Sequence, residues 1–161
     1  MMDVVAPVFE WLTARPLVWI MIIYLIIKQW QARQPFPESG GKVKSIGTDA
    51  EWAAAKANGR PKVIDAYATW CPPCRAAAPV YGQMSTLYPD VDFYKVDVDK
   101  NPAVAQELGV RSMPTFKVFD GTHKELGTVV GFQRSQIEKL LEPVRSATAK
   151  SESAKAETKA E

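Results

Sequence analysis

Both cysteines of this 161-residue chain lie in the stretch Trp70-Cys71-Pro72-Pro73-Cys74-Arg75. Two cysteines at this spacing can form a reversible disulfide, contribute to a metal site, or be an incidental pair. A closed zinc site usually takes about four Cys or His ligands. Because His123 is the only histidine, the chain holds at most three such ligands. The ligand count argues against a metal site and leaves a redox pair or an incidental spacing.

The position of the pair favours redox chemistry. The run Lys62 to Ala68 (KVIDAYA) is typical of a buried strand, and a helix is predicted directly after the motif. If Cys71 is the N-cap of that helix, Pro72 and Pro73 take its first positions, where a missing N–H matters least. The amide of Cys74 then points back at the Cys71 sulfur.

This arrangement gives the two thiols different roles. A thiolate is the species that attacks a disulfide, and a helix N-terminus lowers a thiol pKa below the free value of about 8.5. Cys71, exposed at the helix start, is therefore the predicted nucleophile. Cys74, one turn further in, is predicted to resolve the mixed disulfide.

Asp65 lies six residues before Cys71, inside the apolar run VIDAYA. A buried carboxylate is protonated more readily than an exposed one, so Asp65 can relay a proton to or from Cys74. The alternative is a strand acid that faces solvent at a sheet edge. The residues alone leave both interpretations open.

Local patterns predict an α/β domain around the motif, with a central mixed β-sheet flanked by helices in the order β-α-β-α-β-α-β-β-α. Thr48 and Glu51 form a capping box, Asn101-Pro102 caps a later helix, and Asp120-Gly121 predicts a hairpin turn. Strands are predicted over residues 42–46, 62–68, 91–98, 115–119 and 125–130, and helices over 48–58, from the motif to about 87, over 101–109, and around Ile137, Leu140 and Leu141.

Three stretches of the sequence resemble the thioredoxin family in residue type and spacing: VIDAYATWCPPCRAAAP, YKVDVDKNPAVAQELGVRSMPTF and VVGF. The resemblance covers about residues 42–144. It implies the thioredoxin fold and a protein-disulfide reductase that serves cell redox homeostasis through the Cys71–Cys74 couple. It also implies protein substrates with disulfides, no bound cofactor, and recharging by a separate NADPH-dependent thioredoxin reductase. The chain has no glycine-rich dinucleotide motif of its own, which agrees with a separate reductase.

The resemblance also assigns site residues. Asp65 matches the buried proton relay, Lys95 the lysine that tunes it, and Pro114 the proline after a cis peptide bond. Backbone at Met113 is implied to pair with the substrate chain. The remaining matches are a substrate-binding surface at Trp70, Val130 and Gly131, and the active-site loop at Pro72 and Pro73.

The chain departs from the family at two of these positions. Most thioredoxins have glycine where Pro72 stands, and many have tryptophan where Tyr67 stands. Pro72 stiffens the loop and should alter the redox potential. Two other functions stay open: a disulfide oxidase or isomerase in an oxidising compartment, and a non-catalytic interaction module that keeps only the fold.

Residues 1–34 differ from the rest of the chain and predict an N-terminal hydrophobic helix. Pro16 to Ile27 is a run of twelve residues without a charge, whereas a spanning helix needs about 20 apolar residues. Trp11 and Trp30 bracket a 20-residue window that is about 30 Å long as a helix. We predict a membrane anchor at about residues 11–30; an amphipathic or partner-buried helix is the alternative.

Charge sets the predicted orientation and limits the partners. Lys28, Arg33, Lys42 and Lys44 follow the apolar run, so the positive-inside rule places the domain on the cytosolic face. A soluble cytoplasmic protein is the alternative. The net charge of +2 offers no basic field for nucleic acid. After residues 1–34 come a predicted linker at 35–41, a thioredoxin domain at 42–145 and a disordered charged tail at 146–161.

Overall fold

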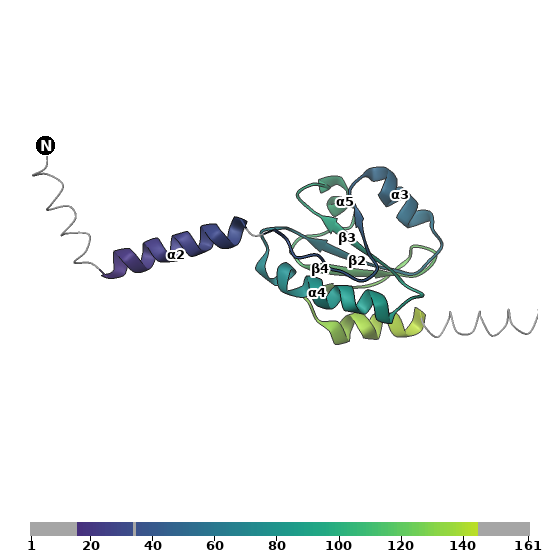
Figure 1. Ribbon diagram of the computed structural model, residues 1–161. Coiled ribbons are helices and arrows are strands. Elements are labelled where there is room, and N and C mark those ends of the chain that lie inside the picture. The colour runs from purple at the N-terminus through teal and green to yellow at the C-terminus, as the bar shows by residue number, and fades with distance from the viewer. Residues whose placement is uncertain (1–15, 34, 145–161) are drawn as a thin grey trace, which may run out of the picture. The chain divides into compact units, whose positions relative to one another are not determined.

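The computed structural model describes residues 16–33 and 35–144 (Figure 1). The chain divides into two compact units, with the boundary between Pro35 and Phe36. The first contains helix α2 (Pro16–Arg33), and the second contains the sheet and its covering helices. The predicted disordered tail at 146–161 lies outside the described residues.

Helix α2 exposes large apolar side chains around its surface. Its uncharged run ends at Ile27, and the last six residues, Lys28 to Arg33 (KQWQAR), include two cations and two glutamines. No helix within residues 16–33 and 35–144 is both long and apolar enough to cross a membrane. The predicted anchor at about residues 11–30 is therefore not confirmed, and residues 11–15 of that window lie outside the described residues. The physical reason is the length of the uncharged run, because its twelve residues reach only about 18 Å as a helix, whereas the hydrocarbon core of a bilayer is about 30 Å thick.

The second unit is built on the predicted mixed sheet, which is confirmed. Its strands lie in the order β1-β3-β2-β4-β5. The β1–β3 and β3–β2 pairs are parallel, and the β2–β4 and β4–β5 pairs are antiparallel. Strand β2 is therefore central and buried along its whole length. The strands are β1 (Val43–Ile46), β2 (Lys62–Tyr67), β3 (Asp92–Asp97), β4 (Thr115–Phe119) and β5 (Glu125–Val130).

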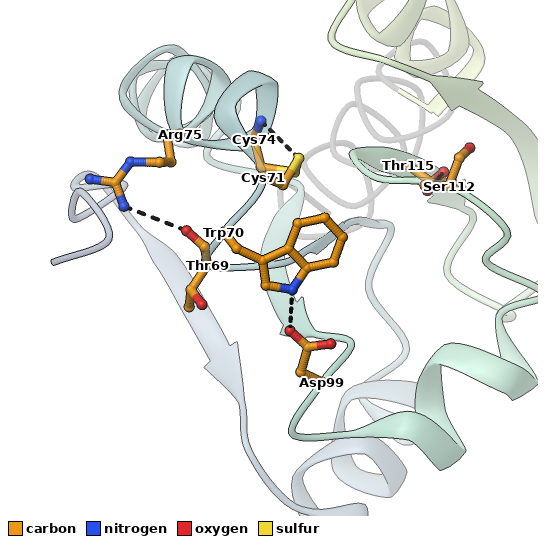
Figure 2. Close-up of a disulfide and its surroundings, with 8 residues drawn as sticks. All are labelled: Thr69, Trp70, Cys71, Cys74, Arg75, Asp99, Ser112 and Thr115. Carbon is orange, nitrogen blue, oxygen red and sulfur yellow. Dashed lines mark hydrogen bonds between the residues drawn. A yellow bond between two sulfur atoms is a disulfide. The ribbon is translucent and has the colours of Figure 1, made fainter. Parts of the chain in front are cut away.

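Helices cover both faces of this sheet (Figure 1). Helix α4 (Pro72–Leu87) and a last helix over residues 134–144 pack on one face through a core around Tyr81, Phe93 and Phe116. Helices α3 (Asp49–Ala57) and α5 (Pro102–Glu107) pack on the other face, around Trp52, Ile64 and Val104. The two cysteines lie where β2 leads into α4 (Figure 2).

The local sequence signals for helix caps and turns are confirmed at one position and differ from the structure at two others. The capping box is confirmed, since the Thr48 hydroxyl accepts from the Glu51 amide at 3.2 Å and Glu51 accepts in return. Asn101 stands at the N-cap of α5 but its side chain does not cap it. Its amide donates instead to the carbonyl of Ile46 at 3.2 Å. The hairpin turn is longer than predicted, because the Asp120 amide pairs with the Lys124 carbonyl.

The predicted linker is in contact with the domain from Phe36 onward. Ser39 is buried, and its carbonyl oxygen would lie 1.5 Å from a Cβ atom at Gly82 of α4. The backbone amide of Lys42 donates to the Ser85 hydroxyl of the same helix at 2.7 Å. Residues 36–41 thus pack closely on α4, although two prolines and two glycines suggested a spacer.

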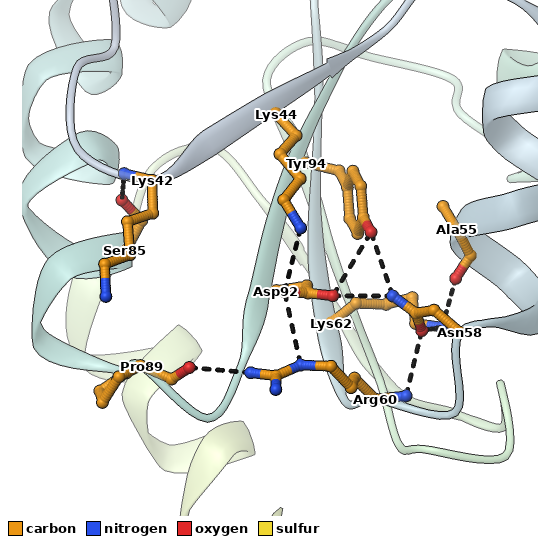
Figure 3. Close-up of polar contacts among 10 residues, drawn as sticks. All are labelled: Lys42, Lys44, Ala55, Asn58, Arg60, Lys62, Ser85, Pro89, Asp92 and Tyr94. Atoms are coloured by element: carbon orange, nitrogen blue, oxygen red, sulfur yellow. Dashed lines mark hydrogen bonds and ion pairs between the residues drawn. The ribbon is translucent and has the colours of Figure 1, made fainter.

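Lys62, the first residue of β2, is fully buried and joins helix α3 to the sheet (Figure 3). Its ammonium group donates to the carbonyl of Ala55 at 2.6 Å and to the Asn58 side chain at 2.9 Å. Burial lowers the pKa of Lys62, and the carboxylates of Asp92 and Asp120 oppose that shift. The cation therefore satisfies carbonyl groups at the C-terminal end of α3, where a positive charge is favourable.

Replacing Lys62 by Met should lower the free energy of unfolding by about 1–3 kcal/mol, because buried acceptors lose their donor. Urea denaturation measures the difference. Lys44→Met is the matched control, since the Lys44 side chain is 60% exposed and ion-paired with Asp92 at 3.5 Å. We expect that control to change stability by less than about 0.5 kcal/mol. Equal losses in the two variants would contradict the structural role of Lys62.

Candidate active site

The cysteine pair is a disulfide at the first turn of α4, with Cα atoms 5.3 Å apart. Cys71 is the N-cap, as predicted, and its sulfur accepts a hydrogen bond from the Cys74 amide at 3.3 Å (Figure 2). Pro72 and Pro73 occupy the first helical turn, where proline is tolerated because those amides lack helical partners. The helix therefore directs an N–H donor at the Cys71 sulfur.

The disulfide is enclosed on its inner side. Cys74 has no exposed surface, and Cys71 is only 4% exposed. The prediction that Cys71 is exposed is wrong for this oxidised form. The reason is that both sulfurs belong to a small apolar cluster with Tyr67 and Ala68. We name these four residues, Tyr67, Ala68, Cys71 and Cys74, the redox cluster.

Asp65 lies in the middle of the central strand β2 and is 1% exposed. Burial raises the pKa of its carboxyl from an ordinary 3.8 to about 7, and the charge of Lys95 opposes the shift. Lys95 is its partner in register on β3. The Oδ1 atom of Asp65 has no hydrogen-bond partner among the described residues. The alternative of a solvent-facing edge acid is therefore excluded.

A second loop reaches the site ahead of β4. The peptide bond between Met113 and Pro114 is cis, and Met113 packs against the redox cluster. The Pro114 carbonyl accepts a hydrogen bond from the Gly131 amide at 2.8 Å. Gly131 has φ of 76°, a conformation that glycine adopts without strain. The segment after β5 is thereby held beside the cis-proline loop.

Two apolar side chains remain open to solvent around these elements. Trp70 is 63% exposed and Val130 is 59% exposed. The indole N–H of Trp70 donates to the Asp99 carboxylate at 2.8 Å (Figure 2). This hydrogen bond holds the ring in place while most of its surface stays exposed to solvent. Asp99 was missed by the sequence reasoning, because nothing local in the run VDVDK distinguishes it from its acidic neighbours.

Two further residues at the site were missed. The Phe36 ring lies 4.5 Å from that of Tyr67, and the Arg75 guanidinium lies 5.9 Å from the Phe36 ring. The available signal was a single aromatic residue between two prolines in a stretch interpreted as a linker. Within residues 16–33 and 35–144, no three His, Cys, Asp or Glu side chains gather to hold a metal.

Residues 43–143 match a protein-family model described as Thioredoxin. The chain belongs to the thioredoxin family. Thioredoxin Asp f 28 of Aspergillus fumigatus is 39% identical over 106 residues, which are 66% of this chain and 97% of that protein. A thioredoxin H-type of Brassica oleracea is 43% identical over 114 residues, 68% of this chain and 92% of its own length.

Solved thioredoxin structures agree with this assignment. The crystal structure of thioredoxin NaTrxh from Nicotiana alata is 37% identical with a TM-score of 0.61, covering 65% of this chain and 94% of that one. Thioredoxins are thiol–disulfide oxidoreductases that act on protein disulfides. With its paired cysteines at disulfide distance, this member of the family is a thiol–disulfide oxidoreductase as well.

The raised pKa of Asp65 predicts an unusual pH dependence of stability. Between about pH 4 and 7 the folded protein holds a proton that the unfolded chain has released. The free energy of unfolding of the oxidised protein should therefore fall as the pH rises through this window and level off above it. The shift from 3.8 to about 7 corresponds to on the order of 4 kcal/mol.

Asp65→Asn should abolish this slope and be the more stable protein at pH 8, because the buried charge is removed. Chemical denaturation at several pH values measures both effects. Asp90→Asn is the control, since Asp90 is exposed and should keep the wild-type slope. An Asp65→Asn variant with the wild-type pH dependence would show that another group is responsible.

Proposed function

We propose that this thioredoxin-family protein reduces disulfides in other proteins and thereby serves cell redox homeostasis. The observation that carries the proposal is the unequal setting of the two sulfurs. Cys71 receives an N–H donor at a helix N-terminus and keeps the small exposed surface of the pair, 4%, while Cys74 has none. A reductase needs this inequality, because one thiol must meet the substrate and the other must only resolve the intermediate.

In the first step the reduced protein uses Cys71 as the nucleophile. Its thiolate attacks one sulfur of the substrate disulfide, a bond forms between these two sulfurs, and the other substrate sulfur leaves as a thiolate. The Cys74 amide and the α4 N-terminus favour the charged form of Cys71. Pro72 and Pro73 hold this turn in the helical conformation without competing donors.

In the second step Cys74 loses its proton and attacks the Cys71 sulfur. The Cys71–Cys74 disulfide forms and the substrate leaves with its second thiol, so two electrons have passed to the substrate. Asp65 is the proposed proton acceptor. It shares a face of β2 with Val63, which packs on α4, and its pKa of about 7 suits proton transfer near neutral pH. Lys95 tunes that pKa through its charge.

Substrate chains are proposed to bind over the open apolar side of the site. The backbone at Met113, next to Pro114, would pair with an extended substrate segment as an added strand does. Trp70 and Val130 offer exposed apolar surface on either side, and Gly131 lets a backbone approach closely. Electrons would return from NADPH through a separate thioredoxin reductase.

The proposal predicts that the purified protein, with NADPH and a thioredoxin reductase, reduces the disulfides of insulin. Cys71→Ser should reduce the rate to background, since the attacking sulfur is gone, while its unfolding curve stays cooperative. Insulin turbidity and NADPH consumption measure the rate. No Cys71-dependent reduction would contradict the proposal and favour an interaction module. A dithiol potential above about −180 mV, against about −270 mV for a thioredoxin-like reductant, would favour an oxidase or isomerase.

Attachment to a membrane, with the domain on the cytosolic side, stays a prediction. It is supported by the uncharged run of α2, in which Leu17, Ile20 and Ile26 are more than half exposed. We expect the full-length protein to remain in the membrane fraction after alkaline extraction and its domain to be digested by protease added to the cytosolic side. A matched variant with Ile23→Lys and Ile26→Lys should be released. Release of the unaltered protein would favour the soluble alternative.

A further inference from the structure

The segment before β1 forms part of the wall of the redox cluster. Its Phe36 ring contacts Tyr67, with ring centres 4.5 Å apart and planes tilted by 36°. The guanidinium of Arg75 lies 5.9 Å from the Phe36 ring centre. Tyr67 precedes the cysteine pair and Arg75 follows it, so Phe36 bridges the two sides of the motif.

Several contacts hold this segment in one place. Gly40 and Gly41 both have positive φ angles, 67° and 60°, which turn the chain onto α4. Ser39 is 5% exposed, and Gly82 approaches its carbonyl so closely that any side chain there would collide with it. The bond from the Lys42 amide to Ser85 closes the segment at its end (Figure 3). Phe36 is therefore positioned by backbone contacts as well as by its own ring.

The redox cluster has three partly buried apolar neighbours, namely Phe36, Val98 and Met113. Val98 directly follows β3 and Met113 precedes the cis-proline, so both belong to the sheet framework. Phe36 alone of these three comes from the segment ahead of the sheet. We propose that Phe36 is a positioning residue of the redox centre, which closes the Tyr67 side of the cluster and keeps the Cys74 thiol out of solvent.

This role has a chemical purpose that rests on the proposed function. During resolution, Cys74 must react only with the Cys71 sulfur of the mixed disulfide. A thiol that solvent can reach is also open to alkylation, oxidation and exchange with other thiols. The cover does not change the reaction steps. It restricts which reagents reach the second sulfur.

The test measures reagent access to each thiol in the full-length, fully reduced protein. Iodoacetamide is added under native conditions, and mass spectrometry of peptides follows the modification of Cys71 and Cys74 separately. In the unaltered protein we expect modification at Cys71 and little at Cys74. In Phe36→Ala, the rate at Cys74 should rise by about tenfold or more, because its cover is removed. Phe36→Tyr should restore protection.

Phe119→Ala is the control for general destabilisation. Phe119 belongs to the core on the opposite face and pairs with Lys62, at the end of β2 away from the cysteines. If unfolding exposed Cys74, this variant would show the same rise; we expect it to keep Cys74 protected. Gly82→Ala should expose Cys74 as Phe36→Ala does, since it displaces the segment without altering the ring.

The inference would be overturned if iodoacetamide modified Cys74 no faster in Phe36→Ala than in the unaltered protein. It would also be overturned if the modification rate of Cys74 rose equally in Phe119→Ala. Thiol access is independent of insulin reduction. A protein that fails to reduce insulin but exposes Cys74 on loss of Phe36 would refute the proposed function and leave the positioning role intact. Normal insulin reduction by the unaltered protein, together with unchanged reagent access to Cys74 in Phe36→Ala, would support the proposed function and refute the positioning role.

Discussion

The hydrogen bond from the Cys74 amide to the Cys71 sulfur requires strand β2 to end and helix α4 to begin within a few residues. Much of the second unit serves this junction. Strand β2 is central and paired on both sides, so its end is fixed by β3 and β4. Helix α4 is fixed against the sheet by Tyr81, whose buried hydroxyl lies 3.0 Å from the Val63 carbonyl and 2.9 Å from that of Tyr94. The relative position of the two sulfurs follows from these attachments.

The same central position imposes a cost at Asp65. A carboxyl beneath a rigid, enclosed site cannot be solvated, which is why its pKa lies near 7. An apolar residue would stabilise the domain more, but it could neither accept nor release a proton. The charge of Lys95 on the neighbouring strand limits this cost by opposing the rise in the pKa of Asp65, and the Oδ1 atom of the carboxyl has no hydrogen-bond partner among the described residues. The buried carboxyl of Asp65 therefore lowers the stability of the domain at the position where proton transfer is proposed.

Features encoded by neighbouring residues could be predicted from the sequence. The strand and helix order, the Thr48 capping box and the N-cap position of Cys71 each depend on residues a few positions apart. Contacts between distant segments could not. The Asn101 amide reaches β1, and Phe36 reaches Tyr67 across two intervening elements. Proline and glycine in residues 35–41 signalled a break in regular structure correctly, but a break does not reveal whether the segment is free or packed.

Of the two departures from the family pattern, Tyr67 depends on contacts between distant segments and Pro72 on its immediate neighbours in the sequence. Tyr67 is understood only through the fold, because Phe36 packs on its ring and burial raises its pKa to about 12, so the side chain stays neutral. Pro72 is understood from local chemistry. With proline at both positions between the cysteines, neither has an N–H to offer. The amide of Cys74 is then the first helical donor, and the stabilisation of a Cys71 thiolate by this turn depends on the second cysteine's own backbone.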